Sequence, residues 1–442
     1  MDSIPFARPF VGKEEEEAVL RVLRSGWLTT GKEALAFEEE FSRFLGKGPQ
    51  GGGPAGSPAD GGAEPGIAPP CLAVNSATSG LHLALEACGV RAGDLVFLPS
   101  YTFTSSAEVV RYLGAQPVFV DVGPESFHLD CEALESTLER LSRGLPPYPS
   151  RQGGEGFGPR GRAAAVMPVH YGGLPCDMAA ILDTARRYGL RVVEDAAHSF
   201  PSYYSPSETA GGENAFPAGS KAAGYAGTLG DAGVFSFYAT KTLSTGEGGM
   251  VACGDPELAR RISLMRSHGI DRSIWNRYTD SRASWYYQVL EPGFKYNLPD
   301  LLAGIGRVQL GRAWELLEMR REIAGAYDRA FGGDPHFSIP PSSPANAWHL
   351  YPLRLKAETL SIGRDEFAAK LQEGGVGVSV HFIPLHTMPY YREVYGLEPE
   401  DLPHSMESFR REISLPIWPG MDRTMTERII GLVQSTAARY TA

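Results

Sequence analysis

The sequence lacks several features that would place it in a large class of proteins at once. It has no run of about 18 apolar residues and no N-terminal basic segment followed by an apolar core, so we expect neither a membrane span nor a signal peptide. Its five cysteines form no C-x-x-C pair, which argues against a disulfide framework and a cysteine metal site. Basic residues are few, 41 against 52 acidic, and the net charge of -11 argues against a nucleic-acid surface. We therefore expect a cytoplasmic protein whose partners are small molecules and protein.

The chain of 442 residues does contain short apolar runs that alternate with helical patterns. Several runs are apolar throughout, as in strands covered on both faces, and this predicts an α/β fold with a mainly parallel sheet. We expect a large α/β domain over residues 1–300. Residues 301–442 would hold a long linking helix from about Pro299 and a small α+β domain. The strand-like runs are 94–100, 116–121, 164–169, 190–195, 233–237 and 249–254, with 347–355 and 376–386 in the small domain.

Three Gly/Pro-rich stretches interrupt this pattern, at 47–70, 143–162 and 201–227. They have no periodicity and too few apolar residues to offset the entropy of ordering them. We expect surface insertions.

One lysine follows a buried strand directly. The stretch DAGVFSFYATKTLSTGEGGM (231–250) runs from an apolar strand to Lys241 and then to a glycine-rich loop. Burial at a cleft favours the neutral amine form of a lysine over the charged ammonium. The neutral amine can add to the carbonyl of an aldehyde cofactor. The alternative is an ordinary surface lysine after a core strand.

Other polar groups also follow predicted strands, where ligands of parallel sheets bind. The turn at 75–80 opens a helix, so its N–H groups could hold a phosphate, or Ser76 or Thr78 could simply cap the helix. Asp195 could hold the protonated ring nitrogen of an aromatic cofactor, or cap a following helix. Phe103 could be the face on which a planar cofactor stacks, or part of the core.

Together these parts are the ones a pyridoxal phosphate site needs. The lysine binds the aldehyde, the aspartate pairs with the ring nitrogen, the aromatic ring stacks, and the hydroxyls of Thr78, Ser79 and Ser236 bond the phosphate. Two further features are less specific. The loop at 25–31 could touch a ligand, and His381 and His386 have no acidic neighbours, so a substrate or core role is expected and a metal site is not.

The sequence also resembles a known family along its whole length apart from the insertions. It is similar to the DegT/DnrJ/StrS nucleotide-sugar aminotransferases, which have the fold-type I, aspartate-aminotransferase-like fold with a seven-stranded sheet. The matching segments are IPFARPFVGKEEEEAVLRVLRSGWLTTG, NSATSGLHLAL, PSYTFTSSAE, VHYGGLPCDM, VVEDAAHSF, FSFYATKTLSTGEGGM, RSHGI, GFKYNLPDLLAGIGRVQL, VHFIPLHTMPYYRE and SLPIWPGM.

The resemblance implies roles for individual residues. Lys241 would bind pyridoxal 5'-phosphate covalently and carry the proton, and Asp195 would pair with the ring nitrogen. His198 would lie beside the cofactor hydroxyl, where many members have Gln. Residues implied to bind the phosphate are Thr78, Ser79 and Ser236, and those implied to contact the nucleotide sugar are Trp27, Leu28, Thr29, Thr30 and His381. Within GFKYN, either Lys295 or Asn297 would reach across a homodimer to the phosphate.

The implied activity moves an amino group from L-glutamate to a keto carbon of a nucleotide-diphosphate sugar. The GFKYNLPD form is closest to enzymes that aminate C4 of a UDP-4-keto sugar. One alternative is a pyridoxamine-dependent sugar dehydratase, which carries His in place of Lys241. Another is a regulatory protein that only binds ligand, although no helix-turn-helix region accompanies the domain. The sequence leaves open the sugar, the nucleotide and the carbon.

Overall fold

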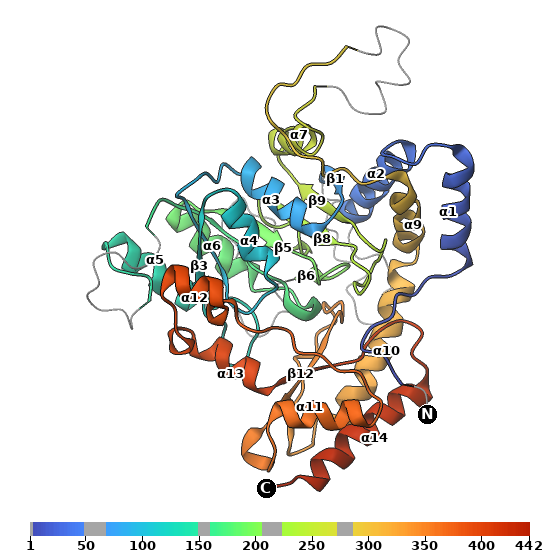
Figure 1. The fold of residues 1–442 in the computed structure, drawn as a ribbon, viewed down its shortest axis with the longest axis vertical. Coiled ribbons are helices and arrows are strands. Elements are labelled where there is room, and N and C mark those ends of the chain that lie inside the picture. The colour runs from blue at the N-terminus through green and yellow to red at the C-terminus, as the bar shows by residue number, and fades with distance from the viewer. Residues whose placement is uncertain (1–2, 48–67, 149–159, 206–222, 272–285) are drawn as a thin grey trace.

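A seven-stranded sheet forms the centre of the computed structural model, which describes residues 3–47, 68–148, 160–205, 223–271 and 286–442 (Figure 1). Across the sheet the strands are β1 (Cys71–Val74), β9 (Gly249–Cys253), β8 (Ala232–Ser236), β5 (Arg191–Asp195), β4 (Ala163–Val166), β2 (Leu95–Pro99) and β3 (Gln116–Val120). The β1/β9 and β9/β8 pairs are antiparallel and the other neighbours are parallel. This arrangement confirms the predicted α/β fold with a mainly parallel sheet.

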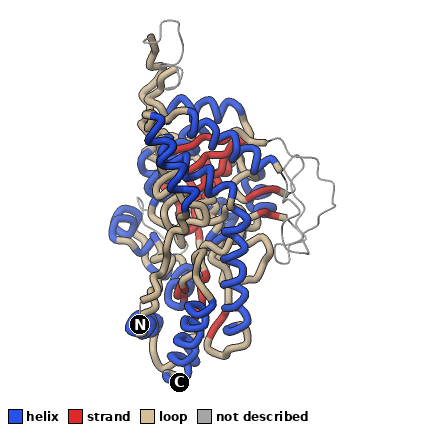
Figure 2. The backbone as a smooth tube through the Cα atoms, turned by 90° about the vertical axis from the view of Figure 1, so that its right-hand side faces the viewer, coloured by secondary structure: helices blue, strands red, loops and turns tan. Residues whose placement is uncertain are grey.

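Helices cover both faces of this sheet, which explains why its strands are apolar without alternation. One face packs against α3 (Ala77–Ala87), α4 (Ser105–Tyr112), α7 (Pro256–Met265) and α12 (Pro389–Tyr395). The other face packs against α2 (Lys32–Gly46), α5 (Cys131–Ser142), α6 (Met178–Tyr188) and α9 (Asp300–Gly311). The first helix, α1 (Lys13–Ser25), lies against α9. Figure 2 shows the strands enclosed between these helices.

A second core lies in the C-terminal part of the chain. It is built on the antiparallel strands β10 (Phe337–Ser338), β11 (Tyr351–Leu355) and β12 (Glu412–Leu415), packed against α10 (Ala313–Phe331), α11 (Arg364–Glu373) and α14 (Arg423–Arg439). Ile4 belongs to this core and pairs with Val376, so the start of the chain lies beside its C-terminal part (Figure 1). The helix α13 (Pro403–Arg411) and the short pair β6 (Tyr203–Tyr204) and β7 (Gly224–Tyr225) complete the α-helices and strands of the described residues.

Two predicted elements differ from the structure. The segment 376–386 is not a strand, because it pairs only through isolated bridges at Val376 and Ser379 and then enters a short 3-10 turn after Pro384. The predicted single helix from Pro299 is two helices, since the backbone at Arg312, after Gly311, leaves the helical region with φ -104° and ψ 6°.

Most of the three predicted insertions lies outside the described residues, at 48–67, 149–159 and 206–222. In the part of the chain that is described, every helix is too short or too polar to span a lipid bilayer.

Candidate active site

A cavity of about 580 Å³ opens at the carboxyl ends of the parallel strands, where the sequence predicts the ligand site. Its walls come from both cores. Of the predicted site residues, the structure brings seven together in the lining of this cavity: Thr78, Phe103, Asp195, His198, Ser236, Lys241 and His381.

Lys241 stands in the cavity wall in a turn after β8. Its backbone N–H donates to the Tyr238 carbonyl at 2.9 Å, and the neighbouring Thr242 hydroxyl donates to the Phe200 carbonyl. Burial lowers the pKa of the Lys241 ammonium to about 8, against the opposing effect of the Asp195 charge. The neutral, nucleophilic amine is therefore a larger fraction of this side chain near neutral pH than it is for an exposed lysine.

Asp195 ends β5 and is buried beneath the cavity. Its carboxylate accepts hydrogen bonds from the Ser106 hydroxyl at 2.9 Å and from the Ala197 N–H at 3.1 Å. Burial raises the pKa of this carboxyl, while both hydrogen bonds act to lower it. The helix-capping alternative is wrong, because a turn rather than a helix follows β5.

His198 is buried beside Asp195 with a fixed tautomer. Its Nδ1 accepts from the Gly172 N–H at 3.2 Å, and burial lowers its pKa well below the usual value. The ring is therefore neutral and carries its proton on Nε2. This leaves one N–H donor at the cavity wall.

His349 is a site residue that sequence reasoning missed. Its Nε2 lies 3.4 Å from the Lys241 Nζ, and its ring centroid lies 4.3 Å from that of His198. Among the described residues its buried Nδ1 has no hydrogen-bond partner, and burial lowers its pKa well below the usual value. The sequence places this histidine in the apolar run AWHLYPLRL, which predicts a strand over 347–355, whereas β11 begins at Tyr351 and His349 lies before it.

The first turn of α3 faces the cavity with Ala77 and Thr78, positions whose backbone N–H groups have no intrahelical acceptor. The capping prediction is confirmed for Ser76, whose hydroxyl accepts from the Ser79 N–H at 3.1 Å. The Ser79 hydroxyl is turned into the same cap and donates to the Asn75 Oδ1 at 2.6 Å. Ser79 is therefore buried behind the turn rather than in the cavity lining.

Phe103 follows β2 at the mouth of the cavity. Its side chain is 57% exposed, so the core alternative is wrong. The ring lies 6.1 Å from that of Phe382, another residue of the lining that sequence reasoning missed.

The remaining predicted residues lie outside this lining, and four of them contact one another. The Thr30 hydroxyl donates to the Leu298 carbonyl, the Asn297 amide donates to Thr30, and the Lys295 ammonium donates to the Asn297 amide oxygen. Trp27 donates its indole N–H to the Thr30 carbonyl at 3.2 Å. Leu28 and Thr29 belong to the same loop, which is a separate cluster from the cavity within this chain.

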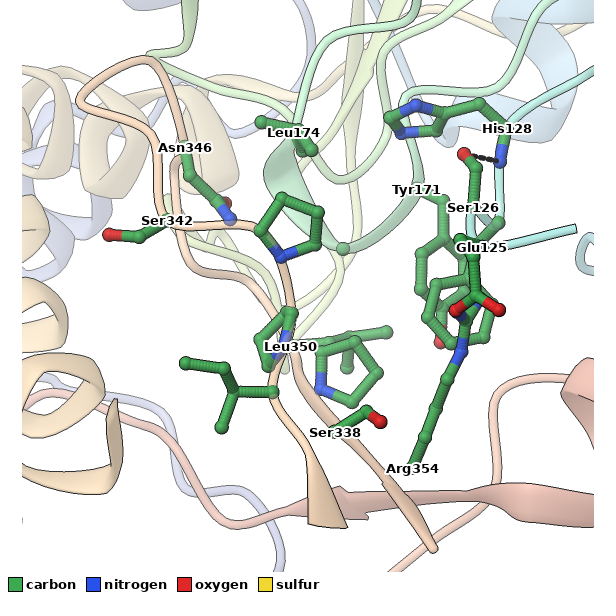
Figure 3. Close-up of a pocket in the computed structure, with 16 residues that line it drawn as sticks. Glu125, Ser126, His128, Tyr171, Leu174, Ser338, Ser342, Asn346, Leu350 and Arg354 are labelled. Carbon is green, nitrogen blue, oxygen red and sulfur yellow. Dashed lines mark hydrogen bonds and ion pairs between the residues drawn. The ribbon is translucent and has the colours of Figure 1, made fainter. Parts of the chain in front are cut away.

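A second cavity of about 380 Å³ has Tyr171 in its wall, and the Tyr171 hydroxyl donates to the carbonyl of His381, which lines the first cavity (Figure 3). Its lining combines three prolines and other apolar side chains with polar and charged ones. Arg354 reaches into it, with its guanidinium 4.0 Å from the Phe127 ring centroid and 3.4 Å from the exposed Glu125 carboxylate.

Pyridoxal phosphate fits the first cavity. The cavity supplies an amine of lowered pKa, a buried carboxylate, an exposed aromatic ring at its mouth and a helix start with available N–H groups. His349, whose buried Nδ1 has no hydrogen-bond partner among the described residues, also lines this cavity. Fold and site together define a pyridoxal-phosphate enzyme of the fold-type I aminotransferase class.

Comparison with known proteins makes this more specific. The chain belongs to the DegT/DnrJ/EryC1/StrS aminotransferase family, whose sequence profile matches residues 9–49 and 66–434. It is therefore a sugar-aminotransferase-family enzyme that uses pyridoxal phosphate. It is 37% identical over 434 residues to the spore coat polysaccharide biosynthesis protein SpsC of Bacillus subtilis, covering 98% of this chain and 96% of SpsC.

Solved structures agree with this assignment. The aminotransferase TlmJ of Streptoalloteichus hindustanus is 30% identical and superposes with a TM-score of 0.77, covering 99% of each chain. The pyridoxal-phosphate form of the putative sugar aminotransferase Spr1654 of Streptococcus pneumoniae is 25% identical, with a TM-score of 0.77 and 99% coverage of both chains.

Proposed function

We propose that this enzyme transfers the amino group of L-glutamate to a keto carbon, C4, of a nucleotide-diphosphate sugar in the cytoplasm. The observation that carries the proposal is the Lys241 amine of lowered pKa, which lies in one cavity with Asp195. The similarity to SpsC, a protein of polysaccharide biosynthesis, supports a sugar as the acceptor.

Bound pyridoxal phosphate would supply an aldehyde that takes up the amino group and a ring that accepts electrons. In the proposal Lys241 holds the cofactor and moves the proton between the carbon atoms that exchange it. Asp195 would pair with the ring nitrogen, and the two hydrogen-bond donors to its carboxylate, the Ser106 hydroxyl and the Ala197 N–H, hold that carboxylate in place. The Nε2–H of His198 would donate to the cofactor hydroxyl.

The phosphate would lie at the start of α3, where the Thr78 and Ser236 hydroxyls join the helix N–H groups. Ser79 would support this site through the cap rather than by direct contact, since its hydroxyl is already bonded to Asn75. His381, which lines the same cavity, would contact the sugar nucleotide.

We also propose a homodimer. Lys295, Asn297 and the Trp27–Thr30 loop lie outside their own chain's cavity, which supports a role for them at the partner's site. Large apolar side chains are exposed around the cavity on Phe103, Tyr238 and Ile383, at 57%, 48% and 47% exposure. An exposed cluster of this kind is typical of a surface that another chain covers.

The first test is an absorbance spectrum of the purified protein with and without L-glutamate. We expect a long-wavelength band that glutamate converts to the pyridoxamine form, and no such band in Lys241→Ala. Lys13→Ala is the matched control, because Lys13 is exposed on α1 and its one ion pair with the described residues is to Glu17. Its spectrum should be that of the wild type.

The second test offers the glutamate-treated protein UDP- and TDP-4-keto sugars and measures recovery of the pyridoxal band. Recovery with one nucleotide identifies the acceptor. A protein that binds the cofactor but is converted by neither glutamate nor any keto sugar would instead be a ligand-binding regulatory protein.

A further inference from the structure

Three side chains connect the cavity with the interior of the C-terminal core. His381 lines the cavity, and its Nδ1 lies 2.8 Å from the Ser414 hydroxyl. That hydroxyl contacts the Glu412 carboxylate, which also accepts from the His381 N–H at 2.9 Å. Glu412 and Ser414 are two residues apart on β12, so their side chains share one face of the strand, and both are fully buried.

The His381 ring is held in a defined orientation. The Tyr171 hydroxyl donates to the His381 carbonyl at 2.6 Å, and the Phe6 ring stacks on the imidazole at a centroid distance of 5.3 Å. Because Nδ1 is engaged by Ser414, Nε2 is the ring nitrogen left for a ligand in the cavity.

We propose that Glu412, Ser414 and His381 form a proton relay, in which the protonation of Glu412 decides whether His381 offers the substrate a hydrogen-bond donor or an acceptor. Glu412 and Ser414 are then positioning residues that act through His381. The inference rests on the proposed function only in taking a sugar nucleotide as the ligand.

The proton balance follows from the chemistry of the three groups. When Glu412 is protonated, it donates to Ser414, Ser414 donates to Nδ1, and His381 carries its proton on Nε2. When the relay loses one proton, that proton leaves from Nε2 at the cavity. The remaining two shift along the chain, so that Nδ1 donates to Ser414 and Ser414 donates to the Glu412 carboxylate. The hydroxyl makes this reversal possible, because it can both donate and accept.

The surroundings make Glu412 the place where the proton is stored. Burial lowers the pKa of His381 to about 3, so its ring does not hold a second proton near neutral pH. Burial raises the pKa of Glu412 to about 8, although Ser414, the His381 N–H, Arg364 and Arg354 all act to lower it.

The charged and titratable groups that face Glu412 come from several elements. Arg364 of α11 donates to the Glu412 backbone carbonyl at 3.0 Å. Arg354 of β11 has its guanidinium turned towards Phe127 and Glu125 in the second cavity (Figure 3). The buried phenols of Tyr101 and Tyr171 have pKa values raised far above the titration range of the relay.

The test is histidine ring ¹⁵N NMR of the full chain labelled with ¹⁵N-histidine, recorded from about pH 6 to 10, a range that spans the titration of such a buried carboxyl. His381→Gln assigns the signals among the ten histidines of the chain. We expect His381 to change from the Nε2–H to the Nδ1–H form with a midpoint near the Glu412 pKa of about 8. In Ser414→Ala and Glu412→Gln the change should disappear.

The matched control is Ser405→Ala. Ser405 is also a buried serine bonded to a carboxylate, with its hydroxyl 2.6 Å from Asp121, but it lies outside the cavity. In Ser405→Ala, His381 should change its tautomer with the same midpoint as in the wild type. A wild-type His381 that keeps one tautomer throughout, or a Ser414→Ala protein that titrates normally, would overturn the relay.

A kinetic measurement then connects the relay with the reaction. For a keto sugar that proves active, kcat/KM of the wild type should change with the same midpoint, and Ser414→Ala should flatten that step. The NMR result is independent of turnover, so it distinguishes a failed relay from a failed assignment of the activity. A normal NMR transition with an unchanged pH profile in Ser414→Ala would overturn the relay's role in catalysis.

Discussion

Two buried histidine–glutamate units flank the cavity, and they differ in what holds the histidine. On the sheet side, His170 Nε2 lies 2.9 Å from the Glu194 carboxylate, and its Nδ1 accepts from the Cys176 N–H at 3.1 Å. A backbone N–H can only donate, so the tautomer of His170 is fixed. On the C-terminal side, His381 Nδ1 faces a hydroxyl, which leaves its tautomer free to change.

The two carboxylates differ in the same way. Glu194 accepts from three backbone N–H groups, those of Gly227, Leu229 and Gly230, at 2.6 to 2.8 Å, in addition to His170. Glu412 accepts from one backbone N–H and one hydroxyl. A buried carboxylate surrounded by fixed donors holds the loops together, whereas one with few and reversible donors can exchange a proton.

Glu194→Ala tests most strongly whether Glu194, unlike Glu412, stabilises the surrounding loops. The substitution removes the acceptor for His170 and for three backbone N–H groups that are buried or nearly so, so we expect a loss of about 3–5 kcal/mol in the free energy of unfolding. Denaturant unfolding measures it. Glu139→Ala is the control, since Glu139 is half exposed and pairs with Arg143, and it should change stability by less than about 0.5 kcal/mol. Equal effects in both variants would mean that Glu194 does not hold this region together.

Glu412→Gln should have a smaller effect that depends on pH. The carboxyl has a pKa of 4.5 in its ordinary state and about 8 in the folded protein. Between these values the unfolded chain has released its proton and the folded chain has kept it, so wild-type stability falls as the pH rises through this window.

We therefore expect the wild type to lose on the order of 3 kcal/mol relative to Glu412→Gln between pH 5 and 8.5. Denaturant unfolding at the two pH values measures the difference. Glu407→Gln, at a half-exposed ion pair with Arg411, should follow the wild type. Parallel pH dependences of wild type and Glu412→Gln would show that Glu412 is ionised throughout.

The sequence predicts the sheet well because its strands carry apolar residues in succession and are separated by helical periods. It fails at 376–386, where an equally apolar run lacks a neighbouring strand along most of its length. Strand pairing depends on remote segments, and periodicity does not report it. The division into domains at residue 300 stays a prediction. Ile4, from the start of the chain, packs in the C-terminal core, and α12, from its C-terminal part, packs against the seven-stranded sheet.

The site is predictable to the extent that it follows the strands. Lys241, Asp195 and Phe103 lie at or shortly after the carboxyl ends of strands that meet at one edge, so their convergence could be expected. His349 is 108 residues from Lys241 in sequence, and Ser414 is 33 from His381. No local pattern marks such partners, because the packing of the two cores brings them together.

The smallest expected effect concerns Ser106, a third buried hydroxyl that contacts a carboxylate. It donates to Asp195 at 2.9 Å, and its oxygen lies 3.0 Å from the Thr102 hydroxyl. Ser106→Ala leaves Asp195 with the Ala197 N–H as its remaining donor among the described residues, which raises the carboxyl pKa further and weakens the proposed bond to the ring nitrogen.

The loss of one hydrogen bond to a charged group predicts weaker pyridoxal phosphate binding by about 1.5 kcal/mol, roughly tenfold in Kd, measured by titrating the apoprotein. Thr104→Ala is the control, because Thr104 begins the same helix but bonds Glu108 outside the cavity. If Ser106→Ala binds the cofactor as the wild type does, a single fixed backbone N–H is sufficient to orient Asp195. Reversible hydroxyl contacts would then matter only at Glu412, where the proton itself moves.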